Sequence, residues 1–334
     1  MKNKIFQMIL VCGCAVALFS GCGKEETVGN VSVNDMETEA ENVVTEEAQV
    51  TETVQATEQP VPTFKEQEPI NDEEPDYVIE TGKETTSEKS SLFKEPENVP
   101  TDAQLQTMSA ESSGWGQGTQ VDDLNRPAGC LQFQEKYKSH SVRFIMNDSD
   151  EKTIYLTFDE GYENGYTSQI LDVLKEKNVK AVFFITMDYA KKEPELVKRM
   201  IEEGHIVGNH SVTHPSAGVS SLSLEQQENE IMELHNYVKD NFGYEMYLFR
   251  CPAGIFSEQF LGVMDKLGYT GVFWSFAYHD WDPDNQMTHD EAMKKATESL
   301  HPGAIYLLHA VSSTNTAILG EFIDNAVAEG YTFK

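Results

Sequence analysis

Residues 153–167 read TIYLTFDEGYENGYT, and this stretch decides the fold of the chain. Its first part, residues 153–158, is an apolar and β-branched run, which is typical of a strand buried on both faces. Two carboxylates, Asp159 and Glu160, follow where this strand ends. Strands buried on both faces belong to parallel sheets covered by helices, so the stretch predicts an α/β fold with acidic side chains at one sheet edge.

The same alternation continues to the end of the chain. Further apolar runs lie at residues 181–186, 205–209, 246–249, 271–277 and 304–308. Segments of helical period lie between and after them, at residues 167–178, 193–203, 224–242, 257–267, 289–300 and 317–329. Strands that alternate with helices imply parallel neighbours. Because we see no internal repeat, we predict one α/β domain, either a barrel or an open doubly wound sheet.

Ionisable side chains recur directly after the predicted strands. In chain order they are Asp159, Glu160, His210, Arg250, Asp280 and His309. Parallel strands bring their carboxyl ends to one edge of the sheet, which is where α/β barrels keep their active sites. Any one of these side chains could be a cap or a surface group. Their recurrence favours a single active site.

The motif HSVTH places His210 and His214 four residues apart. On a helical turn this spacing puts both imidazoles on one face, where they can bind one metal ion, although such pairs often only cap or pack. A carboxylate from another strand would complete a two-histidine, one-carboxylate zinc site with an open position for water. Of the adjacent carboxylates at 159 and 160, one could then bind metal while the other takes a proton.

The N-terminus reads as an export signal. A basic start is followed by an apolar core at residues 5–19, which is shorter than the roughly twenty residues that a membrane-spanning helix needs. The sequence LFSGC resembles the lipobox of bacterial lipoproteins, which predicts a signal peptide at 1–22 with Cys22 as the lipidated residue. An ordinary cleaved signal or an uncleaved anchor is the alternative. We expect an extracytoplasmic protein that is lipid-anchored to the outer face of the cell membrane.

Residues 23–113 are predicted to be a disordered acidic linker. From residue 24 to 113 the chain has 23 acidic residues, five lysines and few aromatic side chains. Such a composition buries too little apolar surface to order itself. Residues 114–334, the predicted catalytic domain, hold 33 acidic and 18 basic residues, which argues against a nucleic-acid partner. Cys130 and Cys251 could form a disulfide outside the cell, or remain two buried thiols.

Five ordered motifs resemble those of the polysaccharide deacetylase family, the NodB homology domain. They are TFDEGYENGYT, HSVTH, RCPAG, HDW and YLLH, spread from about residue 153 to 334. The branch that the chain most resembles is the delta-lactam-biosynthetic or peptidoglycan N-acetylmuramic acid deacetylases, known from spore-forming bacteria. The resemblance implies a distorted (β/α) barrel and metal-assisted hydrolysis of an N-acetyl group on a glycan.

The resemblance also implies roles for individual residues. Asp159 is the general base, and Arg250 holds it ionised, because a neighbouring cation lowers the pKa of a carboxyl group. Glu160, His210 and His214 occupy the metal-ligand positions, with zinc as the expected ion. His309 is the acid that protonates the leaving amine.

The chain departs from the family in three of its motifs, and one departure is in the third, where Cys251 and Ala253 stand in place of the usual bulkier or proline residues. Glu160 stands where aspartate is usual, and Ala277 where an aspartate usually opens the fourth motif. We therefore expect Asp280 to orient His309 instead. Tyr162 is predicted to flank the glycan or to pack in its loop, and Trp281 to wall the acetyl pocket or to lie in the core.

The expected activity is deacetylation of N-acetylmuramic acid in peptidoglycan of the cell wall or spore cortex, by a monomer. The same chemistry on N-acetylglucosamine in peptidoglycan or chitin-like glycans is the nearest alternative. A further alternative is a glycan-binding lipoprotein with a degenerate site. Glu160 and Ala277, which depart from the family motifs, favour this alternative.

Overall fold

The computed structural model describes residues 89–334. Three predictions fall wholly or mainly outside the described residues. They are the signal peptide at 1–22, lipidation at Cys22 and the acidic linker up to residue 88.

Eight strands form one sheet in which every strand pair is parallel. The strand order is β10-β3-β4-β5-β6-β8-β2, and β9 also pairs with β3. The strands are β2 (Val142–Arg143), β3 (Thr153–Glu160), β4 (Ala181–Ile185), β5 (Ile206–Asn209), β6 (Leu248–Phe249), β8 (Thr270–Val272), β9 (Ala304–His309) and β10 (Thr332–Phe333). A separate antiparallel pair consists of β1 (Ser113–Gly114) and β7 (Ile255–Phe256).

The sheet curls into an incomplete barrel. The chain that leaves β8 forms a parallel bridge between Phe276 and Tyr306 of β9, which brings the far side of the sheet back towards β3. The distorted (β/α) barrel is therefore confirmed, and the open doubly wound sheet is wrong. The predicted strand at 271–277 is interrupted after Val272, because its second half turns to reach β9.

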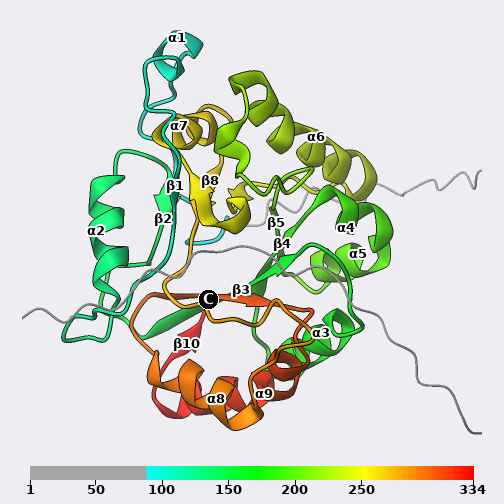
Figure 1. Ribbon diagram of the computed structural model, residues 1–334. Helices are drawn as coiled ribbons and strands as arrows, with labels where there is room; N and C mark the ends of the chain where they lie inside the picture. The colour runs from blue at the N-terminus through cyan, green and yellow to red at the C-terminus, as the bar shows by residue number, and fades with distance from the viewer. Residues whose placement is uncertain (1–88) are drawn as a thin grey trace, which may run out of the picture. The chain divides into compact units, whose positions relative to one another are not determined.

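Helices surround the strands on the outside of the sheet (Figure 1). The α-helices are α1 (Asp102–Leu105), α2 (Ala128–Lys136), α3 (Thr167–Glu176), α4 (Met187–Lys192), α5 (Pro194–Glu202), α6 (Leu224–Phe242), α7 (Glu258–Lys266), α8 (His289–Glu298) and α9 (Ser313–Ala328). Two 3₁₀ turns are η1 (Val219–Ser221) and η2 (Pro252–Gly254). Within residues 89–334, no helix combines the length and the apolar character that crossing a membrane requires.

Most predicted helices are present close to their expected bounds. The predicted helix at 317–329 begins earlier, at Ser313, because the Ser312 side chain caps it by accepting a hydrogen bond from the Asn315 backbone N–H. Helix α2 was missed, since its buried positions, Cys130 and Gln134, do not make an apolar stripe.

Residues 89–113 differ from the predicted linker. Leu92 is fully buried in the barrel interior, with Tyr155 and Phe184 in the same cluster, and Leu105 is fully buried against the outer core. Ser113 pairs with Phe256. The folded domain therefore begins by residue 89 rather than 114. Its apolar contacts were hidden in the sequence because they are single residues within an acidic stretch.

Replacing Leu92 with alanine tests this boundary. Because the side chain fills the interior of the barrel, we expect Leu92→Ala to lower the free energy of unfolding by about 2–5 kcal/mol in urea titrations. Val99, which is 65% exposed in the same segment, provides the control, and Val99→Ala should change little. Equal stability of the two variants would contradict the assignment of this segment to the folded domain.

Candidate active site

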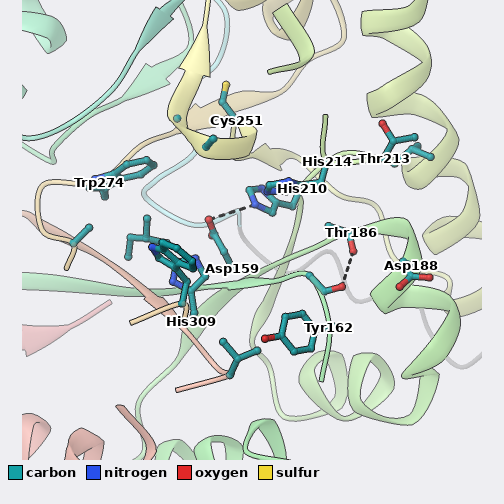
Figure 2. Close-up of a pocket in the computed structure, with 18 of the residues that line it drawn as sticks. Asp159, Tyr162, Thr186, Asp188, His210, Thr213, His214, Cys251, Trp274 and His309 are labelled. Atoms are coloured by element: carbon teal, nitrogen blue, oxygen red, sulfur yellow. Dashed lines mark hydrogen bonds and ion pairs between the residues drawn. The ribbon is translucent and has the colours of Figure 1, made fainter. Parts of the chain in front are cut away.

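The carboxyl ends of the strands surround a pocket of about 690 Å³ (Figure 2). Residues singled out in the sequence that line it are Asp159, Tyr162, His210, His214, Trp281 and His309. Arg250 contacts Asp159, and Asp280 contacts His309. The recurrence of ionisable residues after the strands therefore marks one site, because the parallel strands end at a common edge.

Asp159 is the central carboxylate of the pocket. It is 7% exposed, and its Oδ1 accepts a hydrogen bond of 2.9 Å from Arg250. Its Oδ2 lies 3.5 Å from Nε2 of His210. Burial alone would raise the pKa of Asp159, but the charge of Arg250 outweighs burial and lowers the pKa, and protonation of His210 or His309 would lower it further. Asp159 is therefore held in its ionised form.

Arg250 is completely buried, and its guanidinium hydrogen-bonds to fixed groups of the barrel. Besides Asp159, it donates to Oγ1 of Thr157 at 2.6 Å and to two backbone carbonyls, those of Val272 at 2.9 Å and Phe273 at 3.1 Å. Its guanidinium carbon lies 4.3 Å from the centroid of the Phe184 ring. The cation beside Asp159 is thus rigidly placed.

His309 faces Asp159 from the neighbouring strand β9, where the two residues are paired in register. Its Nδ1 lies 2.8 Å from Asp280 Oδ1, and its backbone N–H donates to Asp280 Oδ2 at 2.8 Å. Burial opposes the charged imidazolium, but the hydrogen bond and charge of Asp280, together with the charge of Asp159, raise the pKa of His309. Asp280 thus orients His309, as expected from the alanine at position 277.

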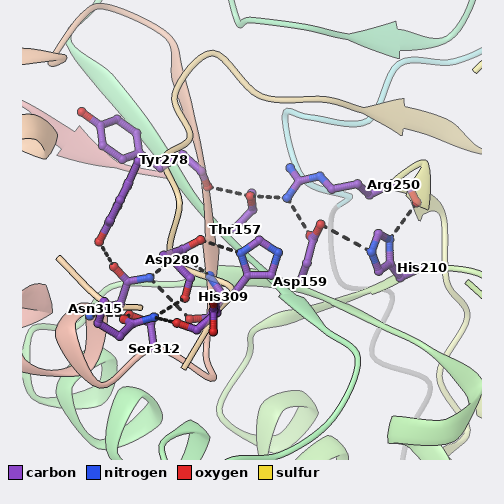
Figure 3. A network of polar contacts seen from close by, with 12 residues as sticks. Thr157, Asp159, His210, Arg250, Tyr278, Asp280, His309, Ser312 and Asn315 are labelled. Carbon is purple, nitrogen blue, oxygen red and sulfur yellow. Dashed lines mark hydrogen bonds and ion pairs between the residues drawn. The ribbon is translucent and has the colours of Figure 1, made fainter. Parts of the chain in front are cut away.

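Asn315 belongs to the same network and was missed in the sequence (Figure 3). Its amide Nδ2 donates to Asp280 Oδ2 at 2.5 Å, and its Oδ1 accepts a hydrogen bond from the Tyr278 hydroxyl. The helix predicted at 317–329 begins two residues after Asn315, so the prediction leaves this residue outside the helix. The signal that could have corrected this is Ser312, a favourable N-cap residue.

The two histidines of HSVTH lie on the opposite side of Asp159 from His309 (Figure 2). The His210 ring lies 4.9 Å from that of His214, measured between centroids. Nδ1 of His210 is 2.9 Å from the Arg250 carbonyl, which can only accept, so Nδ1 carries the proton and Nε2 is left unprotonated towards the pocket. Burial lowers the pKa of His210 to about 4, and the ring is therefore neutral, as a metal ligand must be.

Glu160 differs from its predicted place. It belongs to the regular part of β3, where it pairs with Ile185, so its side chain points to the opposite face from Asp159. It is fully buried and does not line the pocket, and neither carboxyl oxygen has a hydrogen-bond partner among residues 89–334. Burial raises the pKa of Glu160 well above its usual value.

The predicted three-ligand metal set is therefore not assembled. Within residues 89–334, no group of three histidine, cysteine or acidic side chains is arranged to hold a metal ion. The neutral His210 ring and its neighbour His214 fit two ligand positions, but Glu160 does not supply the third.

Exposed aromatic side chains lie at the mouth of the pocket. Tyr162 is 50% exposed and Trp281 is 56% exposed, and both line the pocket. The alternative of a core tryptophan is therefore wrong for Trp281. In the part of the chain that the structure describes, Cys130 and Cys251 are both buried and are not joined by a disulfide.

The pocket of this α/β barrel holds an ionised carboxylate and, facing it, a histidine whose pKa is raised. This is the arrangement of an enzyme that works by acid and base catalysis. The family model described as Polysaccharide deacetylase matches residues 146–272. The peptidoglycan-N-acetylmuramic acid deacetylase PdaA of Bacillus subtilis is 41% identical over 235 residues, which cover 70% of this chain and 87% of that protein. The chain belongs to the polysaccharide deacetylase family.

Solved structures agree with this assignment. The structure of Bacillus subtilis PdaA, a family 4 carbohydrate esterase, superposes with a TM-score of 0.63 at 39% identity, covering 68% of this chain and 95% of that one. The peptidoglycan-N-acetylglucosamine deacetylase PgdA of Listeria monocytogenes is 35% identical over 201 residues, which cover 60% of this chain and 41% of that protein. The family therefore includes relatives named for either sugar of peptidoglycan.

Arg250→Met tests the buried ion pair. Removing the cation leaves the Asp159 carboxylate buried and unpaired, so we expect the free energy of unfolding at pH 7 to fall by about 3–5 kcal/mol. Because the pKa of Asp159 is lowered in the folded state, the pair stabilises the fold above the unfolded carboxyl pKa of about 3.9, and this contribution is lost as pH falls through the folded pKa. The deficit of the variant should therefore shrink in acid.

The double variant Asp159→Asn with Arg250→Met is the matched control in the same urea titrations. It leaves no unpaired charge, so it should be more stable at pH 7 than Arg250→Met alone. A double variant that is less stable than the single one would contradict this account.

Proposed function

We propose that this protein removes the N-acetyl group of N-acetylmuramic acid in peptidoglycan by hydrolysis. The observation that carries the proposal is the opposed pair in the pocket, in which Arg250 holds Asp159 ionised and Asp280 favours the protonated form of His309. Similarity to PdaA of Bacillus subtilis supports the choice of sugar.

The chemistry of an amide explains why both groups are needed. The carbonyl of an acetamido group is weakly electrophilic, and its amine is a poor leaving group. Asp159 would take a proton from water as the water oxygen bonds to the acetyl carbon, which gives a tetrahedral intermediate. His309 would then donate its proton to the nitrogen as the C–N bond breaks, which releases acetic acid and the free amine of the sugar. The acetic acid ionises to acetate in solution, and the proton on Asp159 returns to His309 through solvent. General base and general acid each typically contribute about 10²–10⁴-fold to the rate.

The two pKa shifts run in the directions that this mechanism requires. A base must be unprotonated and an acid protonated at the same pH. Arg250 lowers the pKa of Asp159, and Asp280 raises the pKa of His309. Environments that push the pKa values of two neighbouring groups in opposite directions are a general sign of acid and base assignments.

A divalent cation, for which zinc is our candidate, would be held by His210 and His214. When bound, it would polarise the acetyl carbonyl and lower the pKa of a water molecule. The neutral imidazole of His210 supports this assignment, and the place of Glu160 on the other face of β3 leaves the third ligand position to water or substrate.

Deacetylation of N-acetylglucosamine is the second candidate activity. The name and similarity of Listeria PgdA support it, since the acid and base act on an acetamido group of either sugar. A non-catalytic glycan-binding role is the weakest candidate, because the opposed acid and base are both present. Tyr162 and Trp281, exposed at the pocket mouth, are proposed to contact the glycan in all three cases.

The proposed place of action is the outer face of the cell membrane. The export signal and the lipobox-like sequence before Cys22 support lipid anchoring, which would leave the catalytic domain free to reach glycan strands. Action in the vegetative wall or in the spore cortex, and a monomeric state, are further parts of this proposal.

Incubation of the full chain with two substrates tests the proposed reaction. One is peptidoglycan strands stripped of peptides, and the other is N-acetylglucosamine oligomers. We expect mass spectrometry to detect loss of acetyl groups from muramic acid residues only. A chelator should reduce this loss, because the cation would no longer polarise the carbonyl, and added zinc should restore it.

Asp159→Asn provides the control in this assay, because it keeps the size of the side chain but removes the base. Acetyl loss should fall by about 10²-fold or more. Loss from N-acetylglucosamine alone would select the second candidate activity. Absence of loss from both substrates, with zinc supplied, would rule out a deacetylase acting on either of them.

The pH profile of Asp280→Asn tests the role of His309. Removing the carboxylate lowers the pKa of His309, so the protonated acid is lost at lower pH. We expect the alkaline limb of kcat/KM to move down by about one pH unit or more. Asp284→Asn, an exposed aspartate of the same loop, should leave the limb in place. An unmoved limb in the Asp280 variant would contradict the assignment of His309 as the acid.

A further inference from the structure

We propose that Glu230 of helix α6 is a positioning residue of the active site, which holds the backbone of the loop at 211–214 and thereby fixes His214 in the pocket. Neither the family motifs nor the sequence analysis singled out this residue. The proposal concerns the geometry of the loop and rests on the proposed function only for its activity readout.

Glu230 lies on the buried face of α6, where apolar side chains are expected. The buried positions of this helix are Gln227, Glu230, Ile231, Leu234 and Val238. Glu230 is 8% exposed, and a buried carboxylate is costly unless hydrogen bonds compensate for its lost hydration. A carboxylate at this position therefore needs hydrogen-bond donors from the surrounding structure.

Those partners all belong to the loop between the two histidines. Oε2 of Glu230 accepts hydrogen bonds from the backbone N–H groups of Val212 at 3.0 Å and Thr213 at 2.9 Å. Oε1 accepts a third from the Thr213 hydroxyl at 2.7 Å. One side chain from the next α-helix along the chain thus satisfies two consecutive backbone donors of the loop.

The loop needs such support because its backbone is unusual. Ser211 has φ of 73° and His214 has φ of 48°, both in the left-handed region that side chains other than glycine rarely adopt. Residues persist there only when the surrounding structure fixes them. The first residue of the loop is held in addition by Asn209, whose Oδ1 accepts from the Ser211 N–H at 2.9 Å.

His214 depends on the loop more than His210 does. The His210 ring is buried and is oriented by the Arg250 carbonyl. His214 is exposed in the pocket, and within residues 89–334 its hydrogen bond is made by its backbone N–H, to Ser211 Oγ at 3.0 Å, rather than by its ring. The position of its imidazole therefore follows from the backbone that Glu230 holds.

Two substitutions separate hydrogen bonding from packing. Glu230→Leu suits the apolar face of α6 and preserves helix propensity, but it leaves the N–H groups of Val212 and Thr213 without acceptors. Glu230→Gln can keep all three contacts, because its amide oxygen can accept from both N–H groups while its NH₂ donates to the Thr213 hydroxyl. Glu233→Leu, at an exposed position of the same helix, is the control for the lost charge.

The test measures amide hydrogen exchange and the NMR signals of the His214 ring in the full chain, followed by acetyl release. In Glu230→Leu we expect exchange at Val212 and Thr213 to rise at least 10-fold and the His214 ring signals to shift or broaden. Acetyl release should fall by about 10–100-fold, as is typical for residues that orient a metal ligand. Glu230→Gln and Glu233→Leu should resemble the wild type in all three measurements.

Unchanged exchange or unchanged His214 signals in Glu230→Leu would overturn the proposal, whatever the activity. Changes of equal size in Glu233→Leu would overturn it as well, since lost charge would then explain them. If the wild-type chain releases no acetyl groups, the proposed function fails, and the exchange and ring signals still decide the role of Glu230.

Discussion

The buried ion pair between Arg250 and Asp159 is the constraint on which the site depends. A guanidinium with no exposed surface is tolerable only when its donors are satisfied, and here Asp159, Thr157 and the backbone carbonyls of two consecutive residues at the end of β8, Val272 and Phe273, satisfy them. The pair therefore ties the ends of three strands, β3, β6 and β8, to one another. It also sets the charge of the proposed base, so the same contact serves both the fold and the chemistry.

Parallel pairing explains how the acid meets the base. Asp159 and His309 are far apart in sequence but are register partners on β3 and β9. A second carboxylate, Asp280, then orients the ring of His309 through a contact with its Nδ1. Asp280 lies in the irregular chain that follows β8. The return of this chain to β9 curls the sheet towards a barrel, and the same chain carries Asp280, which raises the pKa of His309.

The surroundings of each ionisable group in and beside the pocket set its preference for the charged or the neutral form. His210 is made neutral by burial, although it lies 3.5 Å from a carboxylate, while His309 is favoured in its charged form by a direct hydrogen bond. Glu160, next in sequence to Asp159, is separated from it by the alternation of a regular strand and has a raised pKa. Adjacent carboxylates therefore have opposite preferences for a proton, because they occupy opposite faces of β3.

Apolar runs and helical periods are local patterns, so the sequence was enough to predict the class of fold, the main strands and helices along the chain, and the sheet edge that carries the site. The family resemblance added Asp280 as the partner of His309. The face on which Glu160 lies, the packing of residues 89–113 and the contacts of Asn315 and Glu230 became known from the structure. These depend on contacts between segments distant in the chain and on the direction in which each side chain leaves its element, and neither is written in local sequence.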